Sequence, residues 1–237
     1  LFFIGSVLMR SAGCIVNDIV DEKIDKRVKR TKSRPIASGS LNKTLAWIYI
    51  ILLCFLALLV LMQFNIKTIY LGIFSMLFAF SYPFMKRFTY WPQLFLGFTF
   101  NWGIIMAWTS ITNEISILPI ILYVGAIFWT LGYDTIYGIQ DISDDEVIGV
   151  KSTAIKFKNN LNMFVGICYS ISSLIFLFVI INVKISYSLI FVLFFIFSLV
   201  YQLIISKYKA PKSCLKAFKN NSFSGLMIFL AFFSLSF

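Results

Sequence analysis

Long apolar stretches alternate with short polar connections along almost the whole chain. Each stretch is about 17–22 residues long, which is the length that a helix needs to cross a bilayer, and none shows the period-2 alternation of transmembrane β-strands. Because backbone polar groups must be satisfied within lipid, the pattern predicts an all-α, polytopic transmembrane helical bundle. The eight predicted spans lie near residues 1–16, 44–63, 68–84, 93–110, 117–137, 161–181, 186–205 and 221–237.

The composition supports an integral membrane protein in the lipid bilayer. The chain of 237 residues is 59% hydrophobic and contains 27 phenylalanines, more apolar surface than a soluble protein of this size can bury. It contains no histidine, which excludes histidine-based catalysis and metal ligation. The four cysteines are widely spaced and are predicted to be free thiols. The first residue, Leu1, and the last, Phe237, both lie in apolar runs, so we expect a single transmembrane domain over residues 1–237, truncated at the N-terminus and also at the C-terminus.

The basic residues predict which side of the membrane each connection faces. All 21 lysines and arginines except Arg10, Lys67 and Lys184 fall in the connections on one side of the predicted membrane. Such a bias assigns that side to the cytoplasm, or to the matrix in a mitochondrion. The net charge of +11 is therefore a topology signal, and we exclude nucleic acid as a partner.

The acidic residues are concentrated on the same side, in two short stretches at 18–25 and 141–146. In the first stretch, Asp18, Asp21 and Asp25 are spaced i, i+3, i+7 and so share one face of a helix. Carboxylates at the mouth of a membrane bundle are costly unless cations hold them. Basic residues follow, at Arg27, Lys29, Arg30, Lys32 and Arg34.

Together with Asp134, the second stretch gives a similar pattern: Asp134, Asp141 and Asp145 are spaced i, i+7, i+11, and Tyr137 occupies the position i+3. Two facing acidic stripes of this kind can hold Mg²⁺, which then binds the phosphate groups of a substrate. The alternative for the first stretch is a solvated helix whose acids form i,i+4 salt bridges. For Asp134, which lies at the end of a span, the alternative is a structural pairing with Arg10 or Lys151.

Two further residues are spaced to point into one cavity. Tyr82 and Lys86 are related as i, i+4 at the end of a predicted span, and Arg87 follows directly. The alternative for the two cations is a plain topology signal.

The motifs together resemble the UbiA superfamily of intramembrane prenyltransferases. The resemblance is carried by Asn17-Asp-x-x-Asp-x-x-x-Asp25 and Asp141-x-x-x-Asp145, and by residues 10–18, 29–35, 82–87 and 133–153. Within the superfamily, these stretches are similar to the 4-hydroxybenzoate polyprenyltransferases of ubiquinone synthesis. The resemblance implies nine transmembrane helices around a central cavity. The family's first helix, which carries an aromatic-substrate contact, has no counterpart here, and we interpret the chain as a fragment.

The resemblance also implies roles for individual residues. Mg²⁺ would bridge the diphosphate to both acidic motifs, through Asn17, Asp18, Asp21, Asp25, Asp141 and Asp145. Tyr82 and Lys86 would contact the diphosphate, and Arg87 would be an active-site arginine. In the expected mechanism Arg34 and Lys151 also stabilise the leaving diphosphate. Asp134 would position the acceptor or take up its ring proton, so Arg87, Asp134 and Asp141 are the expected catalytic residues.

The expected reaction transfers a polyprenyl group from a polyprenyl diphosphate to the ring carbon ortho to the hydroxyl of 4-hydroxybenzoate. The expected location is the bacterial cytoplasmic membrane or the mitochondrial inner membrane, with the site facing the cytoplasm or the matrix. Rival acceptors are haem, homogentisate and a naphthoate. A rival from another class is a cation transporter, although transport acids usually lie near the bilayer midplane on broken helices.

Overall fold

The computed structural model describes residues 1–28, 30–184, 187–207 and 209–236, and every element in this part of the chain is helical. The chain packs as two compact units. Leu1–Arg87 and Ile105–Ile115 form the first, and Phe88–Ile104 and Ser116–Phe237 form the second. The prediction of an all-α transmembrane bundle is confirmed, whereas the prediction of one domain over 1–237 stays a prediction.

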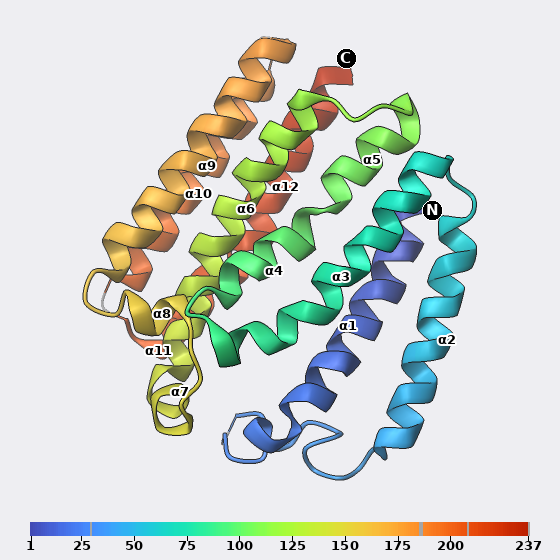
Figure 1. Cartoon of the computed structure of the whole chain (residues 1–237). Helices are drawn as coiled ribbons and strands as arrows, with labels where there is room; N and C mark the ends of the chain where they lie inside the picture. Colours follow the sequence, from blue (N-terminus) through green and yellow to red (C-terminus); the bar gives the residue numbers. More distant parts are fainter. Residues whose placement is uncertain (29, 185–186, 208, 237) are drawn as a thin grey trace. The chain divides into compact units, whose positions relative to one another are not determined.

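The first unit contains α1 (Phe2–Asp25), α2 (Lys43–Leu61), most of α3 (Ile66–Phe88) and the greater part of α5 (Gly103–Thr112). Helices α1 and α2 pack along their lengths, as Figure 1 shows. The side chain of Asn42 starts α2 by accepting a hydrogen bond of 2.9 Å from the backbone N–H of Thr44, which satisfies one of the free donors of the first turn.

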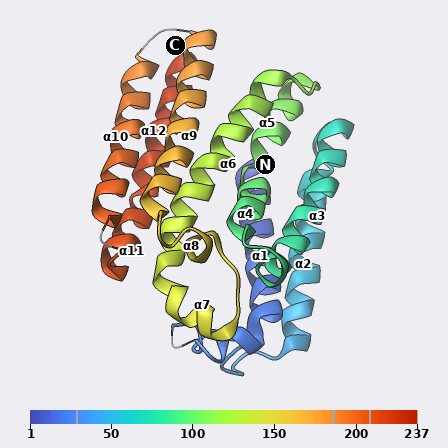
Figure 2. The same ribbon diagram turned by 60° about the vertical axis from the view of Figure 1, so that its left-hand side comes forward.

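The second unit contains the remaining elements. They are α4 (Pro92–Asn101), α6 (Ile117–Gly138), the 3₁₀ turn η1 (Ile139–Asp141), α7 (Ile142–Ile148), α8 (Thr153–Lys156), α9 (Leu161–Val183), α10 (Ser188–Ser206), α11 (Pro211–Lys219), α12 (Asn221–Phe233) and η2 (Ser234–Ser236). Helices α9, α10 and α12 lie side by side in both views (Figures 1 and 2).

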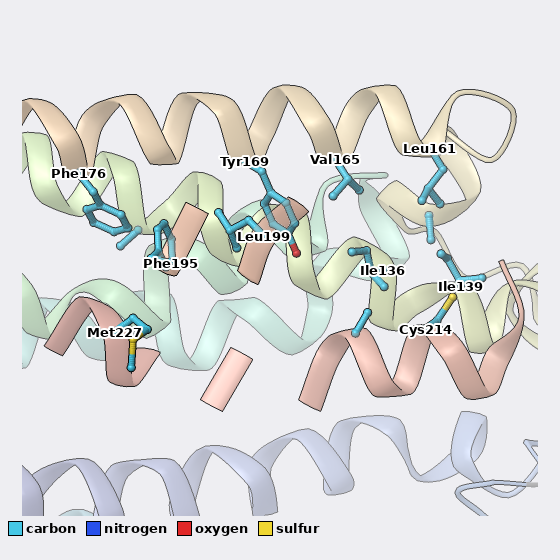
Figure 3. Close-up of a cluster of buried hydrophobic side chains, with 13 residues drawn as sticks. Ile136, Ile139, Leu161, Val165, Tyr169, Phe176, Phe195, Leu199, Cys214 and Met227 are labelled. Atoms are coloured by element: carbon cyan, nitrogen blue, oxygen red, sulfur yellow. The ribbon is translucent and has the colours of Figure 1, made fainter. Parts of the chain in front are cut away.

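Helix α6 is the central element of the second unit and packs against α4 and α9. Glycine allows the close approach to α9, because a Cβ on Gly132 would overlap the ring of Tyr169. The tyrosine hydroxyl is held in turn by Gln202 of α10, at 2.5 Å from Oε1. The surrounding apolar cluster includes Phe176 and Phe195 and is drawn in Figure 3.

Seven segments among the described residues are long and apolar enough to cross a membrane. They correspond to the first seven predicted spans, with three differences. The fifth continues beyond residue 137 to Ile148. The first span runs on to Asp25, so the acidic stretch forms the last turns of α1. The fourth is divided at Trp102 into α4 and α5. The eighth predicted span, 221–237, contains α12, which has 13 residues, and it ends at a residue outside the described part.

Candidate functional site

The acidic face of α1 lies where the spacing of Asp18, Asp21 and Asp25 predicts it. Asp21 is only 2% exposed and Asp25 only 5%. A single guanidinium nitrogen, Nη1 of Arg34, donates to Asp18 Oδ1 at 3.1 Å and to Asp25 Oδ2 at 3.0 Å. The loop after α1 therefore folds back so that Arg34 holds the first and last carboxylates of the stripe, and buried charges of this kind are tolerated only when paired.

The middle carboxylate of the stripe has a different cation. Lys86, near the end of α3, forms an ion pair with Oδ2 of Asp21. The other carboxylate oxygen, Oδ1, is buried and has no hydrogen-bond partner among the described residues. An ionised carboxylate oxygen accepts up to two hydrogen bonds or binds a cation, so Asp21 presents an unused oxygen beside the Lys86 ammonium.

The solvated salt bridges that were the alternative interpretation are also present, but on another face of α1. Glu22 accepts from Lys26, at i+4, with an Nζ–Oε1 distance of 2.8 Å, and its second oxygen is 2.5 Å from Lys43 Nζ. These lysines are more than half exposed, and exposed pairs contribute little to stability. Glu22 is therefore half-buried and paired with exposed lysines, whereas Asp21 and Asp25 are buried.

Three more predicted residues belong to the first unit. Asn17 is half-buried on α1, and Tyr82 is half-buried on α3, one turn before Lys86. Arg87 is exposed, and its Nη2 donates to the carbonyl of Val20 at 2.5 Å. Part of the arginine fork thus binds the end of α1, and the guanidinium carbon lies 5.8 Å from the ring centroid of Phe84.

The second acidic stretch belongs to the second unit. Asp134, in the last turns of α6, Asp141, at the end of η1, and Asp145, in the first turn of α7, are all half-buried. The expected spacing assumed one continuous α-helix over these residues. Instead, the 3₁₀ turn η1 separates α6 from α7, and because 3₁₀ and α-helices differ in residues per turn, the shared face of the three carboxylates stays a prediction.

The loop after α7 presents the remaining predicted cation, Lys151. Gly149 ends α7 with φ of +83°, a left-handed conformation that glycine adopts at low cost. Nζ of Lys151 donates to the carbonyl of Phe88 at 3.3 Å and lies 5.6 Å from the ring centroid of Tyr90. Lys151 lines a hollow of about 250 Å³ together with Tyr90, Glu146, Gly149, Val150 and Ile155.

The structure also reveals polar residues that the sequence interpretation missed. Gln93, Thr135 and Thr153 are buried and form hydrogen bonds with one another below the Lys151 loop. The only sequence signal was a glutamine in an apolar run and a threonine after the Lys151-Ser152 dipeptide.

The predicted residues thus form two groups. The first unit brings the α1 stripe together with Arg34 and Lys86, and the second brings the acids of 134–145 and Lys151 into one helical segment and the loop after it. Among the described residues no three acidic or cysteine side chains are grouped closely enough to hold a metal ion, and the two motifs belong to different units. The joint metal site of Asn17, Asp18, Asp21, Asp25, Asp141 and Asp145 therefore stays a prediction.

These features define a class of protein: a helical integral membrane protein with paired acidic and basic residues at the ends of its spans. The model of the UbiA prenyltransferase family matches residues 1–233. The chain belongs to this family, and the family prediction from its motifs is confirmed.

Curated relatives cover most of the chain. It is 38% identical over 234 residues to the 4-hydroxybenzoate octaprenyltransferase of Vibrio atlanticus. This alignment covers 98% of the chain and 82% of the relative. It is 48% identical over 167 residues to the mitochondrial 4-hydroxybenzoate polyprenyltransferase of Arabidopsis thaliana. This alignment covers 69% of the chain and 40% of that relative.

Solved structures share the fold. A UbiA homolog from Aeropyrum pernix K1 superposes with a TM-score of 0.85 at 21% identity, covering 98% of this chain and 87% of that one. A UbiA homolog from Archaeoglobus fulgidus bound to GPP and Mg²⁺ superposes with a TM-score of 0.70 at 17% identity, covering 99% and 88%.

Proposed function

We propose that the chain transfers a polyprenyl group from a polyprenyl diphosphate to 4-hydroxybenzoate, at the ring carbon ortho to the hydroxyl, in ubiquinone biosynthesis. The observation that carries the proposal is the buried carboxylate stripe of α1 with Arg34 and Lys86 on it, in a family of prenyltransferases. The acceptor follows from the names of relatives at 37–48% identity.

The residues of the first unit fit a diphosphate and its divalent cation. The α1 stripe supplies only oxygen ligands, which suit Mg²⁺, and Asp21 has one buried oxygen without a hydrogen-bond partner in the described part of the chain. The proposed ligands are Asn17, Asp18, Asp21 and Asp25, with Asp141 and Asp145 from the second motif. Bound Mg²⁺ would neutralise charge on the diphosphate and so make it a better leaving group.

The basic residues would bind the departing diphosphate. Lys86 already lies beside the stripe, Arg87 has donors beyond the one that Val20 accepts, and Lys151 lies exposed enough on its loop to reach an anion. Arg34 and Tyr82 are the other proposed contacts. In a site that excludes water these cations stabilise developing negative charge more strongly than in solution.

The reaction breaks the bond between the allylic carbon and the diphosphate oxygen, and the electron pair leaves with the diphosphate. The ring carbon of the acceptor forms the new carbon–carbon bond and then loses its proton. Asp134 is proposed to position the acceptor or to accept this proton. A water-poor bundle protects the allylic cation from hydrolysis and keeps donor and acceptor within reach.

The test is an assay of the full chain in bacterial or mitochondrial inner membranes, the locations that the relatives' names favour. Membranes are supplied with a polyprenyl diphosphate and either 4-hydroxybenzoate, homogentisate, a naphthoate or haem, with Mg²⁺ or after exhaustive EDTA treatment. We expect a ring-prenylated product from 4-hydroxybenzoate, only with Mg²⁺. Full activity after EDTA, or product only from another acceptor, would contradict the proposal.

A further inference from the structure

Three buried polar side chains from separate helices meet below the loop that carries Lys151. The backbone N–H of Thr153, the first residue of α8, donates to Gln93 Oε1 of α4 at 3.0 Å. The hydroxyls of Thr153 and Thr135 of α6 are 2.7 Å apart. Both threonines are completely buried and Gln93 is 7% exposed, so water does not compete for these bonds.

The direction of the hydroxyl contact follows from counting protons. Thr135 Oγ1 donates to the carbonyl of Leu131 at 2.6 Å, and a hydroxyl has only one proton to give. Thr153 is therefore the donor and Thr135 the acceptor. One residue, Thr153, is thus held twice, at its backbone by Gln93 and at its side chain by α6.

The hydrogen bond between Thr135 and Thr153 lies close in sequence to two residues of the proposed reaction, Lys151 and Asp134. Lys151 is two residues before Thr153, in the segment that joins α7 to α8. Asp134 is the neighbour of Thr135 in α6. A change in the Thr135–Thr153 contact would shift the Lys151 ammonium relative to the α6 carboxylate.

We propose that Gln93, Thr135 and Thr153 are positioning residues, which fix Lys151 against α6 so that its ammonium meets the diphosphate of the prenyl donor. The inference rests on the proposed function and adds residues that act through Lys151. Their contribution is orientation, because a small misplacement of a binding group costs a large factor in rate or affinity.

Thr153→Val is the informative change, because it removes the donated hydroxyl proton and preserves the shape. Thr135 keeps its bond to the Leu131 carbonyl, and the Thr153 backbone keeps Gln93, so no buried donor loses its partner. We therefore expect thermal unfolding to shift by only a few degrees. The KM for polyprenyl diphosphate should rise roughly tenfold with the acceptor KM unchanged, and Thr153→Ser should restore it.

Thr130→Val is the matched control. Thr130 is also a buried threonine of α6, and its hydroxyl accepts a bond of 2.8 Å from Asn101 of α4, a residue outside the Lys151 loop. A loss of packing or polarity in α6 would affect this variant as much as Thr153→Val. We expect its donor KM to remain near that of the unmodified chain.

A double-mutant cycle with Lys151→Ala tests the route of the effect. If Thr153 acts through Lys151, Thr153→Val should add little once Lys151 is gone. The inference would be overturned if the donor KM of the double variant rose by the product of the two single factors. It would also be overturned by an unchanged donor KM in Thr153→Val, or by an equal rise in Thr130→Val. Equilibrium binding of a labelled polyprenyl diphosphate gives the same comparison without turnover, so a chain that binds donor but does not prenylate 4-hydroxybenzoate would refute only the proposed acceptor.

Discussion

The ion pair between Asp21 and Lys86 predicts an asymmetric response to mutation. Asp21 is 2% exposed, and among the described residues Lys86 is its only ion-pair partner, since its other oxygen has none. Lys86→Met keeps the side-chain length but leaves a buried carboxylate without its cation. Asp21→Asn instead leaves an ammonium that is already 23% exposed and can reach water along its flexible stem.

The magnitudes follow from burial. Removing one partner of a buried ion pair costs about 3–5 kcal/mol, and two unit charges in contact interact by roughly 4 kcal/mol at an effective dielectric of about 20. The partial exposure of Lys86 places its loss at the lower end, about 3 kcal/mol. Asp21→Asn loses a charge-assisted hydrogen bond without burying a charge, which costs about 1 kcal/mol.

Thermal unfolding of the chain in detergent, followed by tryptophan fluorescence in EDTA so that no divalent cation replaces the lysine, measures the difference. For a domain of this size 1 kcal/mol shifts Tm by about 2–4 °C. Lys86→Met should therefore lower Tm by about 6–12 °C, and Asp21→Asn by less than about 4 °C. The double variant should be more stable than Lys86→Met alone. Equal shifts in the two single variants would refute the burial argument.

Three further predictions concern the rest of the site. Asp141→Ala should abolish turnover in a folded, membrane-inserted protein, and retention of more than about a tenth of the rate, one barrier step of about 1.4 kcal/mol, would remove Asp141 from the metal ligands. Arg87→Lys should greatly reduce turnover and donor affinity, because an ammonium cannot grip a diphosphate at two points; Lys212→Arg and Lys216→Arg, at matched expression, are the controls and should be near neutral. Gly149→Ala should lower the unfolding free energy by about 1–2 kcal/mol, because a side chain is strained at its positive φ, and a denaturant titration showing no loss would contradict this.

The helical period alone predicted the location of the first stripe. Asp18, Asp21 and Asp25 share a face whatever surrounds them, and the structure confirms that they extend one helix. The cations that neutralise them follow from tertiary packing. The spacing of the carboxylates does not predict that Arg34 pairs with two of them, or that Lys86 of another helix pairs with the third.

The second motif was less predictable for two physical reasons. A 3₁₀ turn over Ile139–Asp141 interrupts the continuous α-helix that the spacing of Asp134 and Asp141 assumed. The buried hydrogen bond between Thr135 and Thr153 depends on which helices pack together. The residues on either side of each threonine in the sequence give no sign of it. The family and the all-α fold were confirmed, since long motifs and apolar periodicity need no tertiary information.

The polar contacts of α6 have a consequence for the order of biogenesis. Thr130 bonds to Asn101, which is synthesised earlier, whereas the acceptor site of Thr135 is filled by Thr153, which is synthesised later. While α6 emerges alone, the Thr135 hydroxyl proton is already bound to the Leu131 carbonyl within the same helix, so no hydroxyl donor of this pair faces lipid without a partner. We therefore expect α6 to enter the bilayer before α8 has been synthesised, and the bond from Thr153 to form afterwards.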